Sequence, residues 1–111
     1  MAREPRTWDV DRLGEMSETA IRKLHQPSES FRVGRRKFPS GSCFPGAMMA
    51  GTCYVLKGAC RYTFRAETIV IRAGMWAPLP SGDYKFEVLG SEDVETVLAW
   101  RLPLPSDSAQ G

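Results

Sequence analysis

The chain has 111 residues, and 15 lysines and arginines against 13 aspartates and glutamates leave a formal net charge of +2. That length predicts a single domain, and so small a charge does not by itself indicate a polyanionic partner. The only histidine, His25, excludes a histidine-rich metal site and leaves any histidine-dependent catalysis to that residue.

Residues 1–30 differ from the rest of the chain and are predicted to form an N-terminal extension. Ser17 is a typical helix N-cap, residues 18–24 are compatible with a helix, and Pro27 ends the run. The extension is therefore expected to contain one short helical turn. Ile21 and Leu24 lie three residues apart, so this turn could dock a small apolar edge.

From residue 31 onward, β-branched and aromatic residues become frequent, and turn residues recur about every eight positions. Short apolar runs lie between these turns, at 60–64, 68–71, 75–79, 84–88 and 94–102. This spacing predicts an all-β sandwich or barrel over residues 31–102. The last residues, 103–111, are rich in Pro, Ser and Gly, and we expect a disordered tail.

Alternation along the predicted strands assigns their faces. Tyr84, Phe86 and Val88 share one face, which we expect to point into the barrel. The segment 53–56 is apolar on both faces, so it is expected either at the centre of a sheet or in a subunit interface.

Two segments resemble the two sequence motifs of the cupin superfamily. Gly-Thr-Cys-Tyr-Val-Leu-Lys-Gly at 51–58 resembles the end of the first motif, and Gly-Met-Trp-Ala-Pro-Leu-Pro-Ser-Gly at 74–82 resembles the start of the second. The 15 residues between Gly58 and Gly74 fit the short spacer of small bacterial cupins. The resemblance implies a small single-domain cupin: an all-β, double-stranded β-helix or jelly-roll barrel. It also implies a homodimer, with the segment 53–56 near the interface.

The same resemblance locates the positions at which cupins usually hold a metal. Here they fall at Gly51, at Pro45 and Ala47 or Phe44 and Gly46, and at Tyr84 or Lys85. Alternation favours Tyr84 over Lys85 as the inward residue. A single phenol cannot hold a divalent ion, which needs three or four N, O or S ligands. We therefore expect no metal and no cofactor.

Without a metal, the barrel centre becomes the candidate binding site. Ala47 and Gly51 place small side chains where bulky ligands usually stand, which would leave an apolar cavity with one phenol, that of Tyr84. The competing interpretation is a filled barrel, with Phe44, Met48 and Tyr84 packing the centre. The candidate pocket residues are Ala47, Met48, Gly51, Cys53, Tyr84 and Phe86.

A basic run could bind an anion, but its composition is also typical of a solvated edge strand. In a strand, Arg32 and Arg36 would share one face, and Arg35 and Lys37 the other. Arg35 and Lys37 are the anion-binding candidates. No stacking aromatics accompany this run, so no nucleic-acid partner is expected.

The leading hypothesis is a metal-independent protein with an accessory or sensing role that binds a small apolar or aromatic molecule, with a hydrogen bond from Tyr84. A second hypothesis is an isomerase, cyclase or epimerase that uses Tyr84 as general acid–base, with Arg35 or Lys37 holding an anionic substrate. A third is a metalloenzyme that uses Cys43, Cys53, Cys60 and His25, although small buried cysteines are the favoured interpretation.

The expected compartment is the cytoplasm. The three cysteines cannot all pair in disulfides, and the N-terminus has no apolar region typical of an export signal. No run of 18 apolar residues occurs, so no contact with a membrane is expected.

Overall fold

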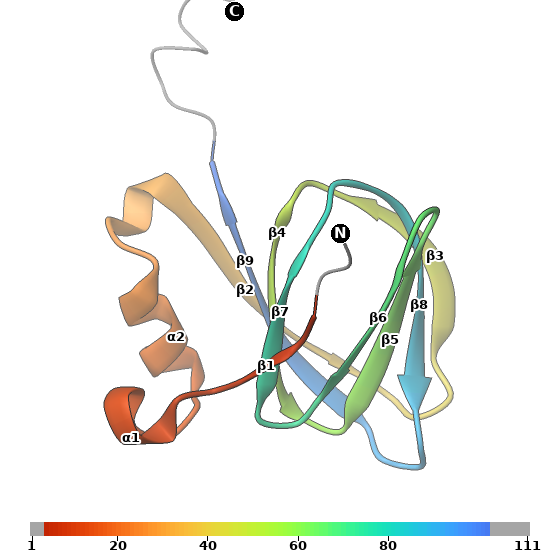
Figure 1. Cartoon of the computed structure of the whole chain (residues 1–111), viewed down its shortest axis with the longest axis horizontal. Coiled ribbons are helices and arrows are strands. Elements are labelled where there is room, and N and C mark those ends of the chain that lie inside the picture. The colour runs from red at the N-terminus through yellow and green to blue at the C-terminus, as the bar shows by residue number, and fades with distance from the viewer. Residues whose placement is uncertain (1–3, 103–111) are drawn as a thin grey trace, which may run out of the picture.

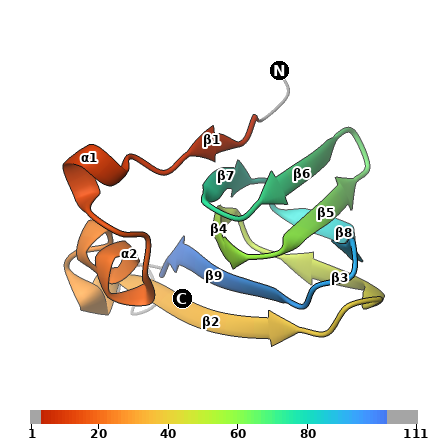
Figure 2. The same ribbon diagram turned by 90° about the horizontal axis from the view of Figure 1, so that it is seen from below.

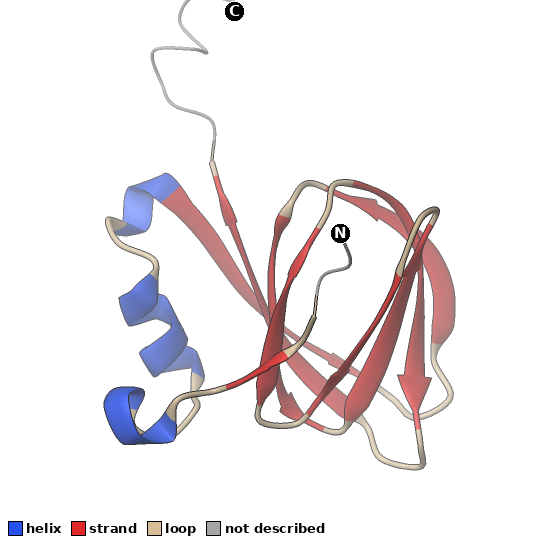
Figure 3. Cartoon of the chain, in the orientation of Figure 1, coloured by secondary structure: helices blue, strands red, loops and turns tan. Residues whose placement is uncertain are grey.

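A computed structural model describes residues 4–102, most of which form short antiparallel strands (Figures 1 and 3). In chain order the elements are β1 (Arg6–Thr7), α1 (Val10–Leu13), α2 (Glu18–Leu24), a 3₁₀ turn (Ser28–Ser30), β2 (Phe31–Phe38), β3 (Cys43–Met48), β4 (Gly51–Lys57), β5 (Ala59–Phe64), β6 (Thr68–Arg72), β7 (Met75–Leu79), β8 (Gly82–Leu89) and β9 (Val94–Arg101). The tail expected at 103–111 lies outside the described residues. Within residues 4–102, no helix has the length and apolar character needed to span a membrane.

The strands form two antiparallel sheets that face each other. One has the order β1-β7-β4-β9-β2 and the other the order β3-β8-β5-β6. Viewed from below, the sheets enclose an interior, and the N-terminal helices lie outside the five-stranded sheet (Figure 2). The predicted all-β jelly-roll barrel is confirmed.

Alternating side chains build the core between the sheets. In β5, Cys60, Tyr62 and Phe64 are buried, whereas the residues between them are partly exposed. In β8, Phe86 and Val88 are buried with the half-buried Tyr84 packed beside them, so the inward face expected for this strand is confirmed. A period of two therefore places these aromatic side chains inside the barrel.

A close approach of two segments explains Gly58, which links β4 to β5. Its φ of +76° is one that L side chains rarely adopt, and an added Cβ would lie 2.6 Å from the Asp93 carbonyl oxygen. Only glycine fits this turn without moving the backbone that leads into β9.

The N-terminal extension forms a second apolar layer on the outer face of the five-stranded sheet. The Ser17 hydroxyl accepts a hydrogen bond from the backbone N–H of Ala20 at 3.1 Å, so the predicted helix cap is confirmed. Ile21 is fully buried, but Leu24 is 44% exposed, so only the first of the two residues predicted to dock does so. Upstream, Trp8 is buried and donates its indole N–H to the Gly14 carbonyl oxygen at 2.8 Å.

Strand β4 lies at the centre of the five-stranded sheet, which explains why both of its faces are apolar. Its inner face carries Cys53 and Val55 into the barrel core. On its outer face, Tyr54 is only 5% exposed because it packs with Trp8 and Ile21 of the extension. The extension of the same chain thus covers the surface that we expected near a dimer interface. The homodimer itself stays a prediction.

Candidate functional site

A cavity of about 360 Å³ opens into the barrel between the two sheets. Strands β2 and β9 supply one wall, and β3, β5 and β8 supply most of the other. The lining is mostly aromatic and aliphatic: Arg36, Phe38, Phe44, Ala47, Met48, Met49, Tyr62, Tyr84, Phe86, Leu98 and Trp100. Its volume lies within the range of about 300–1,000 Å³ that is usual for small-molecule sites.

Three phenylalanines pack together at this cavity. Phe38 and Phe86 have ring centroids 4.7 Å apart, and Phe44 lies 5.1 Å from Phe86, its cross-strand partner in β8. These distances are typical of favourable aromatic pairs. The phenylalanines fill part of the barrel centre, and the cavity leaves another part open. The filled barrel and the open apolar cavity, the two structures considered from the sequence, therefore each describe part of the centre.

Tyr84 provides a phenol at the cavity. It pairs across the strands with Gly46, and its ring lies over that residue because glycine has no side chain. The ring is half-buried and packs edge-on against Tyr62, with centroids 5.3 Å apart. The hydroxyl of Tyr84 can donate or accept a hydrogen bond.

Tyr62 is a second phenol in the lining and was not among the pocket residues predicted from the sequence. Its Oη lies 3.8 Å from the Sγ atom of Cys53. Burial, followed by the neighbouring thiols of Cys53 and Cys60, raises the pKa of Tyr62. Tyr62 is therefore a neutral phenol, not a base, near neutral pH.

Four of the six predicted pocket residues line the cavity: Ala47, Met48, Tyr84 and Phe86. Gly51 does not, because its Cα approaches the backbone of β9, and an added Cβ would lie 2.7 Å from the Ala99 carbonyl oxygen. Cys53 does not either, because it is fully buried in the core below.

Several lining residues were not predicted because they lie on strands outside the two segments that resemble the cupin motifs. Leu98 and Trp100 reach the cavity from β9, and Phe38 reaches it from β2. The alternation of β2 could have revealed Arg36, because that residue shares a face with Phe38.

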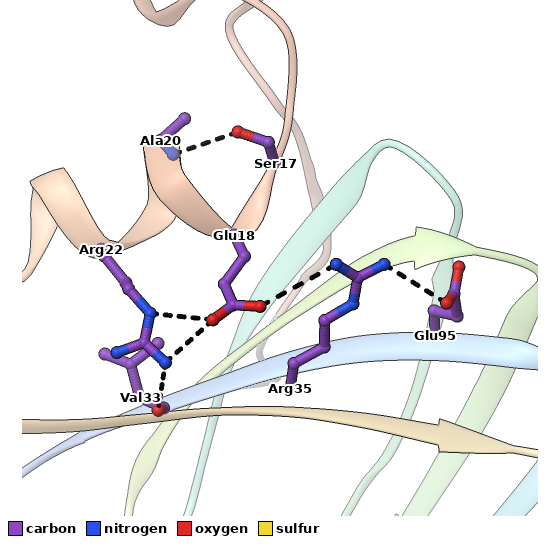
Figure 4. Close-up of polar contacts among 7 residues, drawn as sticks. All are labelled: Ser17, Glu18, Ala20, Arg22, Val33, Arg35 and Glu95. Carbon is purple, nitrogen blue, oxygen red and sulfur yellow. Dashed lines mark hydrogen bonds and ion pairs between the residues drawn. The ribbon is translucent and has the colours of Figure 1, made fainter.

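Arg35 and Lys37, the predicted anion-binding residues, do not line the cavity, but both line a second hollow that runs along β2. Arg35 extends toward α2, where it lies 3.9 Å from Glu18, and its Nη2 atom donates to Glu95 at 3.3 Å (Figure 4). Glu18 also accepts hydrogen bonds from Arg22, so these charges tie the helix to the sheet. As predicted for this basic run, β2 is an edge strand.

The metal usual in cupins does not fit the residues of this barrel. Phe44 and Gly46 face inward on β3, so they, and not Pro45 and Ala47, match the histidine positions. Gly51 has no side chain, and Tyr84 alone offers an oxygen. Within residues 4–102, no three His, Cys, Asp or Glu side chains converge as a metal centre requires.

The residues of the alternative Cys/His metal site are spread over the fold. His25 ends α2 on the outside of the barrel, and its Nε2 atom forms a 2.9 Å hydrogen bond with the Tyr54 hydroxyl. Cys43 is exposed, whereas Cys53 and Cys60 lie in the core. Of these four groups, the structure therefore brings Cys53 and Cys60 together, in the core.

The topology and the inward cavity define a jelly-roll barrel of the cupin type, and solved structures agree. The cupin domain of Cnp3 from Schizosaccharomyces pombe matches with a TM-score of 0.61 and 18% identity, over 78% of this chain and 64% of that one. The EutQ protein of Clostridium difficile matches with a TM-score of 0.58 and 14% identity, over 68% and 59%. A cupin-2 domain protein from Shewanella frigidimarina matches with 0.51 and 16%, over 66% and 72%.

The chain therefore has the fold of a small cupin, as its sequence resemblance implied. It spans less than two thirds of the Cnp3 and EutQ structures. Its sequence matches no protein-family pattern and no curated protein. At identities below 20%, the likeness concerns the fold, which hosts very different chemistries.

Proposed function

We propose that this protein binds a small, largely apolar or aromatic molecule in the barrel cavity without a metal, in an accessory or sensing role. The observation that carries the proposal is the cavity of about 360 Å³ with aromatic walls and the phenol of Tyr84. Apolar burial supplies most of the affinity, at about 25 cal/mol for each Å² of surface removed from water. Tyr84 orients the ligand through a hydrogen bond.

Calorimetric titration with indole and with indene tests this proposal. The two probes have nearly the same shape, but only indole carries an N–H that Tyr84 can bind. Tyr84→Phe is expected to weaken indole binding about three- to tenfold, the usual worth of one hydrogen bond, and to leave indene binding unchanged. Equal effects on both probes would remove the hydrogen bond from the proposal.

A variant that blocks the cavity supplies the second arm. Leu98→Trp enlarges an inward side chain of the lining and is expected to abolish binding of both probes. Leu24→Trp, at the exposed end of α2, is the matched control and should bind both as the parent does. If neither probe binds the parent protein, an open apolar site is not its function.

Catalysis remains a second candidate because Arg36 lines the same cavity as Tyr84. A phenol at this place can act as general acid or base toward a substrate proton, and a guanidinium can hold an anionic substrate. An isomerase, cyclase or epimerase of this kind would lose its kcat in Tyr84→Phe. Activity that Tyr84→Phe leaves unchanged would exclude Tyr84 from the chemistry.

A further inference from the structure

The inward face of β2 carries two arginines with a gap between them. Arg32, Gly34 and Arg36 alternate with outward residues and share the side of the strand that faces the barrel. A Cβ built on Gly34 would meet no atom within 4 Å, so the space above this glycine is open. The two arginines flank an unfilled notch, with their Cα atoms about 13 Å apart along the strand.

The notch is continuous with the apolar cavity. A wider hollow of about 600 Å³ runs along the edge strand β2, and its walls include Arg32, Gly34 and Arg36 together with the outward Arg35 and Lys37. It shares Arg36, Phe38, Leu98 and Trp100 with the cavity. Leu98 and Trp100 are the cross-strand partners of Gly34 and Arg32, so they join the floor of the notch to the apolar wall.

The arginines on the two faces of β2 are used differently. Arg35, on the outer face, makes ion pairs with Glu18 and Glu95. Among residues 4–102, neither Arg32 nor Arg36 has a carboxylate within ion-pair distance. Arg36 is also the only charged residue in the described lining of the cavity. The inward arginines thus leave their positive charge beside an apolar site.

We propose that the ligand is an amphiphilic anion, whose apolar body occupies the cavity and whose oxyanion lies over Gly34 between Arg32 and Arg36. A guanidinium binds a carboxylate or a phosphate through paired N–H donors. The absence of a side chain at Gly34 lets the anion approach the strand. This inference rests on the proposed function, because it names the chemical class of the molecule that the same cavity binds.

Three probes with a common styryl body test the head group: cinnamate, its neutral amide, and cinnamyl phosphate. Calorimetric titration is expected to show that an anion binds at least about tenfold more tightly than cinnamamide, the usual worth of one charge-assisted hydrogen bond. The advantage should shrink as salt is raised, because the notch is open to solvent. The tighter of cinnamate and cinnamyl phosphate identifies a carboxylate or a phosphate as the natural head group.

Two variants locate the anion. Arg36→Gln removes the charge, and Gly34→Val fills the notch while keeping both arginines. Each is expected to remove the preference for the anionic probe, so that it binds no more tightly to the variant than cinnamamide does. Gly34→Val lies in open space on a strand and favours β structure, so it should fold. Arg72→Gln on β6 carries the same charge change away from the notch, as the control.

The outcomes separate this inference from the proposed function. Equal binding of cinnamate, cinnamyl phosphate and cinnamamide overturns the anion site and leaves the apolar cavity standing. Binding of none of the three overturns both. A loss of anion preference in Arg35→Gln but not in Arg36→Gln would place the anion on the outer face and also overturn the inference.

Discussion

The ring of Tyr84 lies directly over Gly46, its cross-strand neighbour at the cavity. A Cβ built on Gly46 would lie 2.6 Å from both Cζ and Oη of Tyr84, which is closer than real Cβ contacts come. Glycine at this position therefore lets the phenol lie flat across β3, where an aromatic ring shields the bare backbone. The cavity owes its shape at this wall to the absence of one side chain.

Gly46→Ala is expected to displace the ring of Tyr84 and to destabilise the fold by about 1–3 kcal/mol, the usual effect of overpacking. Chemical denaturation measures the loss. Gly34→Ala is the control: its space is open, so fewer unfolded conformations should make it neutral or more stable by about 0.4–1 kcal/mol. In a double-mutant cycle, Tyr84→Ala should remove most of the cost of Gly46→Ala. Additive costs would contradict a direct contact between the two residues.

His25 and Tyr54 couple the extension to the barrel in a way that pH can test. Burial lowers the pKa of His25 below 6.5 and raises the pKa of Tyr54 to about 12. The unfolded chain therefore binds a proton more readily than the folded one as the pH falls through 6.5. We expect the free energy of unfolding to decrease between pH 7.5 and 5.5, by no more than about 1.4 kcal/mol per pH unit.

Two variants separate the charge from the hydrogen bond. His25→Gln should flatten this pH dependence because the titrating group is gone. Tyr54→Phe should lower stability by about 1 kcal/mol at every pH while keeping most of the slope, since burial causes the shift. The His25 midpoint can be followed directly by NMR. A midpoint above 6.5, or an unchanged slope in His25→Gln, would count against the coupling.

The strands and their inward faces could be predicted because they depend on local alternation. Phe86 and Val88 are buried where the period of two placed them, and Gly58 forms the turn where the cupin resemblance put it. The cavity lining depends instead on register between distant strands. Trp100 reaches the site only because β9 pairs with β2, a pairing that no local pattern encodes.

The same dependence on long-range contacts explains the misplaced residues. From the sequence alone, Gly51 predicts an unfilled space at the barrel centre. In the structure, its lack of a side chain instead lets Ala99 of β9 approach closely. From the sequence, the apolar outer face of β4 fits a subunit interface as well as it fits a surface covered by the chain's own extension. The structure shows the extension on it, because Trp8 and Ile21 pack there. His25 lies outside the cupin resemblance, so nothing in the sequence connected it with Tyr54.

Thr96 is a buried polar residue whose replacement should not destabilise the barrel. It is fully buried, and its hydroxyl has no hydrogen-bond partner among the described residues. Valine has the same shape without the hydroxyl, so Thr96→Val is expected to be neutral or to stabilise by about 1–2 kcal/mol. Thr63→Val, on the half-exposed face of β5, is the control and should change stability by less than about 0.5 kcal/mol. A loss of more than 1 kcal/mol in Thr96→Val would mean that the hydroxyl has a partner in solution.

The three thiols should differ sharply in reactivity because the fold separates them. Cys43 is exposed on β3, whereas Cys53 and Cys60 are fully buried side by side in the core. A hydrogen bond with Cys53, followed by burial, raises the pKa of Cys60, which keeps its reactive thiolate form rare. A chromogenic aromatic disulfide should therefore release one equivalent from the native protein and three from the unfolded chain. Cys43→Ser should release none before unfolding. A fast second equivalent from the parent protein, or any fast release from Cys43→Ser, would show that the barrel core opens to the reagent.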